Sequence, residues 1–312
     1  MKKKYFSFIA LILVFVMFLI AAGCGVRING KEYEFYKSNQ SEKKNGGIFS
    51  GIGQETSESQ EYTQDKAEGE ELKVKTNAGN VDITKNNGSG IIVNADKKVR
   101  GTSEEAKKTI LENMIVSLEK SGDRLEVVVK TKDGKDFWDW QKENYRTYQI
   151  TINYDIEVPE GVKSLNISTG AGNVNVESLA EKVKISTGAG NITINEMTAL
   201  FDLSTGAGNI DISGSSAKGD CKLSTGAGNV NFEGNIDSVD EFDASTGMGN
   251  LDFTVPGETK MSLEASTGVG ALSGSFVRTN EDSKFRYKGD INGGGPSVKL
   301  STGVGNVAVD ED

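Results

Sequence analysis

The sequence predicts an all-β fold: a parallel β-solenoid (β-helix) of about 18–21 residues per rung, with an N-terminal helix and strand elaboration acting as a cap. Its main evidence is the motif Ser-Thr-Gly-x-Gly-Asn, which recurs at spacings of 18, 18, 20, 21, 21 and 35 residues. Short segments of alternating apolar and polar residues flank each copy, and the chain has 38 Gly but only 3 Pro. A fixed period of this length is typical of repeat architectures. The copies begin at Ser168, Ser186, Ser204, Ser224, Ser245, Ser266 (a variant ending in Ala271) and Ser301.

Residues 1–23 have the pattern of an export signal. Three lysines at positions 2–4 precede an apolar run over 5–22. The segment then ends in Ala-Ala-Gly-Cys24, which resembles the bacterial lipobox and implies a lipoprotein whose Cys24 carries a lipid. The alternative is an uncleaved transmembrane helix, because roughly 18 apolar residues can just span ~30 Å of hydrocarbon. Either interpretation places the remaining chain outside the cytoplasm, and the first adds lipid anchoring to the cell membrane.

Composition narrows the classes of function and of stabilisation. The formal charge of −10 argues against a nucleic-acid partner. Cys221 is the one cysteine besides Cys24, so acylation of Cys24 leaves no disulfide to form. Residues 24–70 are rich in Ser, Gln, Glu, Lys and Gly and poor in large aliphatics, which predicts a flexible envelope linker. The alternation around Asn29-Gly30 adds a short hairpin within it.

Residues 71–160 are expected to hold the first rung and the cap. Residues 72–83 form a degenerate repeat, with Thr-Asn-Ala-Gly-Asn over 76–80 in place of the motif. A helix is predicted over 103–114, with Thr102 and Glu105 as a capping box. Strands are predicted over 114–118, 124–131 and 148–158. Because a terminal rung has an open core, these elements are expected to cover it.

Residues 161–312 are predicted to be the solenoid itself, each repeat forming strand, turn and strand. The turn needs glycine and asparagine because such residues tolerate positive φ. A common period superposes aliphatic columns such as Ile167, Ile185, Leu203 and Leu223, while the motif Ser, Thr and Asn are expected outside the core, Asn as a ladder. The 35-residue gap predicts either a rung without the motif or a loop insertion after Phe276. The structural turn residues are Gly170, Gly172, Asn173, Gly188, Gly190, Asn191, Gly206, Gly208, Asn209, Gly226, Gly228, Asn229, Gly247, Gly249 and Asn250.

These repeats, the degenerate first copy and the segment over 291–307 resemble the bacterial putative-adhesin domain with β-strand repeats. The resemblance covers about residues 71–312. It implies a β-solenoid on the cell envelope, and it brings no catalytic residues with it.

Chemical alternatives fit the residues poorly. A calcium β-roll would need aspartate where the repeats have Val174, Ile192 and Ile210, and no Lys-Ser/Thr completes a phosphate-binding loop. A polysaccharide-active β-helix enzyme needs clustered carboxylates, whereas the acidic residues are scattered and histidine is absent. Cys221 shares the inward column, so we interpret it as packing. The chain is therefore predicted to be no enzyme, with no cofactor and no metal.

Phe137, Trp138, Trp140 and Tyr145 form an aromatic cluster apart from the repeats. Such clusters stack on sugars or anchor protein partners, although they also plug open cores. The sequence thus predicts a membrane-anchored, extracytoplasmic binding or structural module, an adhesin, whose partner is an unknown envelope protein or glycan. The alternative is an envelope-stress or signalling partner lipoprotein.

Overall fold

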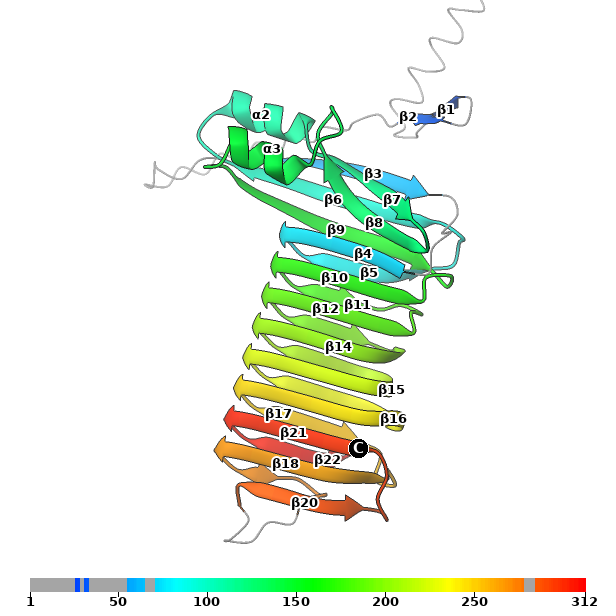
Figure 1. Ribbon diagram of the computed structural model, residues 1–312, viewed down its shortest axis with the longest axis vertical. Helices are drawn as coiled ribbons and strands as arrows, with labels where there is room; N and C mark the ends of the chain where they lie inside the picture. Colours follow the sequence, from blue (N-terminus) through cyan, green and yellow to red (C-terminus); the bar gives the residue numbers. More distant parts are fainter. Residues whose placement is uncertain (1–25, 29–30, 34–54, 65–70, 278–283) are drawn as a thin grey trace, which may run out of the picture.

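A computed structural model shows the chain as a long rod of stacked strands with a cap at one end (Figure 1). It describes residues 26–28, 31–33, 55–64, 71–277 and 284–312. The predicted export signal and Cys24 lie outside these residues. Strands β1 (Val26–Ile28) and β2 (Lys31–Tyr33) pair as the predicted small antiparallel hairpin, separate from the rod.

Each repeat folds as one rung of the rod: a first strand, a sharp bend at Gly-Asn and a second strand on the opposite side. First strands pair in parallel with first strands, and second strands with second strands, in register with the motif. In β15 and β16 the second strand of one rung continues into the first strand of the next. The strands concerned are β4 (Glu71–Ala78), β5 (Val81–Asn86), β10 (Ser164–Ala171), β11 (Val174–Val176), β12 (Lys182–Ala189), β13 (Ile192–Asn195), β14 (Thr198–Ala207), β15 (Ile210–Ala227), β16 (Val230–Met248) and β17 (Leu251–Val255).

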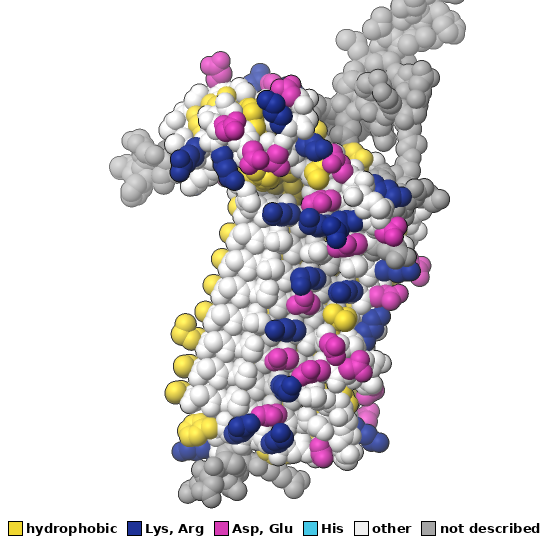
Figure 2. Space-filling model, in the orientation of Figure 1, with side chains coloured by type: hydrophobic (Ala, Val, Ile, Leu, Met, Phe, Trp, Pro, Cys, Tyr) yellow, Lys and Arg dark blue, Asp and Glu magenta, His cyan; other side chains and the backbone are white. Residues whose placement is uncertain are grey.

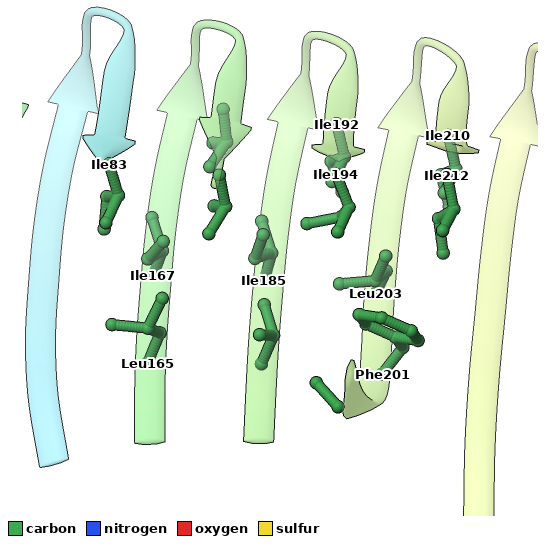
Figure 3. Packing of buried hydrophobic residues seen from close by; sticks show 14 of the residues in the cluster. Ile83, Leu165, Ile167, Ile185, Ile192, Ile194, Phe201, Leu203, Ile210 and Ile212 are labelled. Carbon is green, nitrogen blue, oxygen red and sulfur yellow. The ribbon is translucent and has the colours of Figure 1, made fainter. Parts of the chain in front are cut away.

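The core lies between the two sides of the rod and is built from columns of aliphatic side chains (Figure 3). The predicted column of Ile167, Ile185, Leu203 and Leu223 is confirmed by the strand register, and each of these side chains is at most 1 % exposed. Burial of each aliphatic contributes about 1.5–3 kcal/mol. Because one rung has few such residues, its burial depends on the rungs above and below it.

Three phenylalanines on β16 and β17 belong to this core. Phe232 and Phe253 stack with centroids 5.2 Å apart, and Phe242 meets Phe232 edge-on at 4.8 Å. The core is thus partly aromatic around β16 and β17, and it is aliphatic again in β21 (Ser297–Val304), β22 (Val307–Glu311) and β18 (Met261–Val269).

The C-terminal rungs do not stack in sequence order. Strand β21 pairs with β16 on one side and with β18 on the other, and β22 likewise lies between β17 and β19 (Leu272–Ser273). The last rung in sequence is therefore the last but one in space. The 35-residue gap contains β20 (Arg286–Ile291), an antiparallel edge strand on β18, instead of a complete extra rung.

Antiparallel strands also build the N-terminal cap. There β8 (Arg124–Lys130) and β9 (Gln149–Pro159) continue the two sides of the rod in parallel, and the remaining cap strands then pair antiparallel. The expectation of a wholly parallel sheet is therefore corrected: the fold is all-β, with twenty described strands in one mixed sheet. The cap strands are β3 (Glu55–Gln64), β6 (Ile91–Arg100), β7 (Ile115–Ser121), β8 (Arg124–Lys130) and β9 (Gln149–Pro159).

Strand β3 falls within the segment assigned to the linker. It pairs with β6 along its whole length, and the Gln60 side chain donates from Nε2 to the Val116 carbonyl (2.8 Å) and accepts from the Val116 amide (3.2 Å). The side chain thus replaces the backbone partner that the edge of β7 lacks. This strand was not predicted because Tyr62 is its one large apolar side chain, so its sequence lacks the alternation of apolar and polar residues that indicates a strand.

Two short helices cover the cap. The first, α2 (Glu104–Glu112), is predicted by the sequence, but its N-cap is Ser103, whose Oγ accepts from the Ala106 amide at 3.2 Å. Thr102 is therefore one residue too early for the cap. The second, α3 (Phe137–Asn144), was not predicted; its N-cap Asp136 accepts from the Asp139 amide. No helix within the described ranges is long and apolar enough to cross a membrane.

Candidate interaction surfaces

The bend in each rung depends on the second glycine of the motif. Gly190 has φ of 154°, and a Cβ on it would lie 2.0 Å from the Gly172 carbonyl oxygen of the preceding rung. Any side chain would therefore be strained and would clash with backbone. Among the motif residues only the second glycine has a positive φ, so the expectation that the first glycine and the asparagine also need one is corrected. The first glycine is required by close approach instead, because a Cβ on Gly188 would lie 2.5 Å from the Gly170 carbonyl oxygen.

The motif threonines point inward, which corrects the expectation that they lie outside. They are 3–6 % exposed, and from the second rung onward each Oγ1 donates to a glycine carbonyl of the adjacent rung at 2.7–3.4 Å. Thr187, for example, bonds Gly172. The residue before the bend is thus a polar core residue whose hydroxyl is satisfied by the neighbouring backbone.

The asparagines form the predicted ladder, but each side-chain oxygen accepts a hydrogen bond from a backbone amide. Each Oδ1 accepts from the backbone N–H of the asparagine one rung further on, at 2.8–3.0 Å, from Asn153 in β9 through Asn80 to Asn306. The ladder ends when the Ala271 amide donates to Asn306. Ala271 belongs to the terminal rung, so no amide follows that an asparagine there could accept from. The order of rungs in space therefore explains the one variant motif.

An exposed apolar ridge runs along the edge where the rungs bend (Figure 2). It consists of the residue between the two motif glycines, and its side chains grow toward the C-terminal end of the rod. Met248, Val304 and Val269 are 61, 52 and 65 % exposed, and they lie on consecutive strands. We call this row the ridge; in spatial order it comprises Ala78, Ala171, Ala189, Ala207, Ala227, Met248, Val304 and Val269.

Beside the ridge lies a strip that is flat and uncharged from β10 onward, with Lys75 in the serine position on β4, and then a column of charged residues. The strip consists of the outward motif serine and first glycine, such as Ser186 and Gly188. The charge column alternates in sign along the rod. Its members in spatial order are Glu126, Lys73, Asn166, Lys184, Asp202, Lys222, Asp243, Lys299, Glu264 and Lys288.

Ion pairs link neighbours in the charge column. Lys184 Nζ lies 2.6 Å from Asp202, and Lys73 lies 2.8 Å from Glu126. A hydrogen bond to Glu241, followed by the charges of Glu241 and Asp243, raises the pKa of Lys299. Exposed pairs of this kind contribute little stability individually. Their regular alternation instead gives this side of the rod a defined pattern of charge.

The opposite side of the rod carries amides and carboxylates. Asn175 Nδ2 lies 2.5 Å from Asp82, and Asn231 Nδ2 lies 2.5 Å from Asp211. Burial, and then the charge of Asp310, raise the pKa of Asp252. Among the described residues no three His, Cys, Asp or Glu side chains are grouped so that they could hold a metal ion.

The predicted aromatic cluster lies on α3 and in the loop after it. Phe137 is fully buried, so its side chain cannot itself contact a partner in this conformation, whereas Trp138, Trp140 and Tyr145 are partly buried against the core. The rings form a chain of contacts with centroids 5.2–5.8 Å apart, ending at Tyr148. The cluster is thus packed into the cap, with part of three rings left at the surface.

Other titratable groups serve the packing. The Cys221 thiol is buried in the inward column and accepts from the Phe201 amide, and burial raises its pKa. A cleft of about 540 Å³ lies where the cap meets the rod, lined by Glu71, Ser121, Asp123, Arg124, Lys163 and Ser164. Burial alone would raise the pKa of Glu71, but hydrogen bonds from Asn166 and Arg124 and the charges of Arg124 and Lys73 outweigh it, so the pKa is lowered.

The ridge and the charge column were both missed by sequence reasoning, although the sequence contains their signal. Aligning the motifs places Met248, Val269 and Val304 at one position and the alternating charges two residues before the motif serine. The aliphatic columns can be recognised within a single repeat because they alternate with polar residues. The surface columns can be recognised only when the repeats are aligned with one another.

Comparison with known proteins gives one family match. Residues 91–310 match the family described as Toastrack DUF4097. No curated protein matches the chain in sequence.

Solved structures with some likeness include a putative cell adhesion protein from Clostridium sporogenes (12 % identity, TM-score 0.38, covering 82 % of this chain and 100 % of that one). Another is a putative adhesin from Bacteroides fragilis (12 % identity, TM-score 0.36, covering 82 % and 97 %). Likeness at these TM-scores is too weak to support an argument about function.

Proposed function

Because the chain belongs to the Toastrack DUF4097 family, matched over residues 91–310, we propose that it is an extracytoplasmic, adhesin-like binding and structural module and not an enzyme. In this proposal the stacked rungs form a β-solenoid rod. The rod is held at the cell membrane through a lipid on Cys24, and residues between Cys24 and the rod separate it from the lipid surface.

The ridge is the observation that carries the proposal. Its three large apolar side chains lie on adjacent strands and are more than half exposed. Contiguous exposed apolar side chains of this kind are typical of interaction sites. They lie at the end of the rod opposite the cap, where an extended object presents its surface to a partner (Figure 1). We therefore assign the C-terminal part of the ridge as the contact for an envelope protein or glycan.

The rungs give this contact its rigidity. The threonine and asparagine ladders each join every rung to the next, in addition to the strand pairing. A preorganised row of side chains loses little conformational entropy when it binds. The partly buried aromatic rings Trp138 and Trp140 at the cap form a second candidate contact, and the same experiment compares the two.

The test uses the full chain in its membrane, with a photo-crosslinking amino acid at position 248, at position 138 or, as a control on the opposite side of the rod, at position 193. Crosslinks to an envelope component are expected at 248 and not at 193. In parallel, the change of Met248, Val269 and Val304 together to Ser is expected to abolish binding in a screen of envelope glycans and membrane extracts. Crosslinks at 138 alone would transfer the contact to the cap, and equal yields at 248 and 193 would exclude the ridge.

Lipid anchoring has its own test. Cys24→Ser is expected to release the mature protein from the membrane fraction or to leave the precursor unprocessed. Mature protein that remains membrane-bound after this change would contradict the anchor.

A further inference from the structure

The side of the rod that carries the flat strip has features of a surface made for contact. It is the outward face of β4, β10, β12, β14, β15, β16, β21 and β18, and we call it the A face. In Figure 2 it shows a band between the ridge and the charge column, with no described segment lying over the band. From β10 onward serine and glycine keep this band flat and uncharged, so another flat surface can approach closely; on β4 the exposed Lys75 and Asn77 take their places.

The charge column on this face has a symmetry of its own. Its ten positions alternate in sign except at Asn166, and the middle of the column lies between β14 and β15. Reversing the column about this middle point places an opposite charge, or Asn166, against every member. The resulting pairs are Glu126 with Lys288, Lys73 with Glu264, Asn166 with Lys299, Lys184 with Asp243, and Asp202 with Lys222.

The ridge shares the same centre. Its eight positions also have their middle between β14 and β15, and reversal places the three large residues against alanines. The pairs are Ala78 with Val269, Ala171 with Val304, Ala189 with Met248, and Ala207 with Ala227. Charge and side-chain size are thus both self-complementary about one point, although they arise from different columns.

We propose that two copies of this chain associate through their A faces, with the rods antiparallel and the two-fold axis running along the strands between β14 and β15. This axis keeps each column opposite its own counterpart while it reverses the order of rungs, which is the operation that the charges and the ridge satisfy. An interface of this kind is self-complementary by symmetry. A shift by one rung would oppose Glu126 to Glu264 and Lys184 to Lys222, so the charges also select the register.

The size of the A face suits a stable pair. Eight strands at ~4.8 Å spacing span about 38 Å, and seven residue steps of ~3.3 Å across a strand span about 23 Å. The product, about 900 Å² per copy, is close to the ~800 Å² per partner of a standard specific interface. The ridge forms the rim of this interface and lies opposite the ridge of the other copy.

The test exchanges the charges of one predicted pair. Lys184 and Asp243 are opposite each other between copies, but within one chain they are three strands, roughly 14 Å, apart. At physiological salt, screening acts over ~8 Å, so they barely interact within a chain. Lys184→Glu alone and Asp243→Lys alone each create two like-charge contacts in the pair, whereas a Lys184→Glu copy and an Asp243→Lys copy oppose each other correctly.

Full chains with two different tags are co-expressed and co-purified from membranes. Wild-type copies are expected to co-purify, each single variant to lose roughly tenfold or more in recovery, and the mixed variants to regain wild-type recovery. Lys85→Glu, on β5 in the other side of the rod, is the matched control and should leave recovery unchanged. Rescue in the mixture also shows that both variants are folded.

The proposal is overturned if wild-type copies do not co-purify, if the single variants co-purify as well as wild type, or if mixing them restores nothing. Crosslinking at position 248 to an envelope component reads out the ridge separately. Failure of the antiparallel pair therefore leaves the proposed function standing, and the reverse also holds.

Discussion

The rod and its N-terminal cap enclose one continuous core by opposite means. In the rod the same few bonds recur: a threonine hydroxyl on a glycine carbonyl and an asparagine oxygen on a backbone amide join each rung to the next. In the cap each contact occurs once, such as buried Lys97 bound by Glu58, Gln60 and the Met114 carbonyl, or the tilted rings of Phe137 and Trp140 on α3. We therefore expect a substitution in the rod to destabilise the neighbouring rungs as well, and a substitution in the cap to destabilise only the cap. The predictions below test this difference.

The largest effect is expected from Gly190→Val in the rod. The new Cβ would meet the Gly172 carbonyl at 2.0 Å, and valine tolerates the φ of 154° poorly. We expect a loss of more than about 4 kcal/mol in the free energy of unfolding, with several rungs disturbed together. Denaturant unfolding measures it. Gly161→Ala is the control because a Cβ there meets nothing within 4 Å; similar losses in both variants would contradict the close-approach account.

A smaller and local effect is expected when Trp138 and Trp140 are changed together to Ala. Both rings are partly buried in the cap, so we expect a loss of about 2–4 kcal/mol in cap stability. Amide hydrogen exchange should accelerate in α3 and β8 and stay unchanged from β12 onward. Faster exchange throughout the rod would show that cap and rod unfold as one unit. If stability is unchanged, the rings serve a partner more than the cap.

The asparagine ladder allows a matched pair of substitutions. Asn209→Ala leaves the Asn229 amide without its acceptor and should cost about 1 kcal/mol. Ala271→Asn adds the motif asparagine to the terminal rung, where no further amide follows, and should stay within about 0.5 kcal/mol of wild type. Thermal unfolding of the two variants distinguishes them. A clear gain from Ala271→Asn would show that the terminal rung has an amide to offer.

The smallest effect concerns pH at the junction of cap and rod. The pKa of Glu71 is lowered in the folded state, so its contribution is present above the unfolded value of about 4.3 and is lost as pH falls through the lower folded value. Glu71→Gln should therefore flatten the dependence of stability on pH below about 4.3 and weaken the contacts with Arg124 and Asn166 at neutral pH. Unfolding midpoints across this range measure the effect. An unchanged pH profile in Glu71→Gln would contradict it.

The sequence predicted what the repeats determine. Register and the aliphatic columns follow from motif spacing, because one period superposes Ile185 on Ile167 and on Leu203. The inward threonine was also available from the sequence, since Thr187 has the same parity as Val183 and Ile185, but a polar residue suggested the surface. Elements outside the repeats were harder to predict, because β3 has little apolar content and α3 is only eight residues long.

The order of the C-terminal rungs was hidden from motif spacing, yet the charges encode it. Stacking in sequence order would place Asp243 beside Glu264. The observed order puts Lys299 between them. Neither the contact surface nor a partner could be derived from periodicity. Packing in the core constrains the inward columns, whereas the outward columns are constrained by the molecules that bind them.

The insertion of β21 and β22 also sets a condition on how the chain is completed. Residues 261–273 are made before residues 297–311, yet they gain a parallel neighbour only when the later strands enter between them and β16 and β17. A growing chain that stops before residue 297 holds two unjoined strand edges and an open aromatic core around Phe253. Strands β21 and β22 therefore close the far end of the described rod, because without them β16, β17, β18 and β19 would present unpaired edges of the kind that promote aggregation.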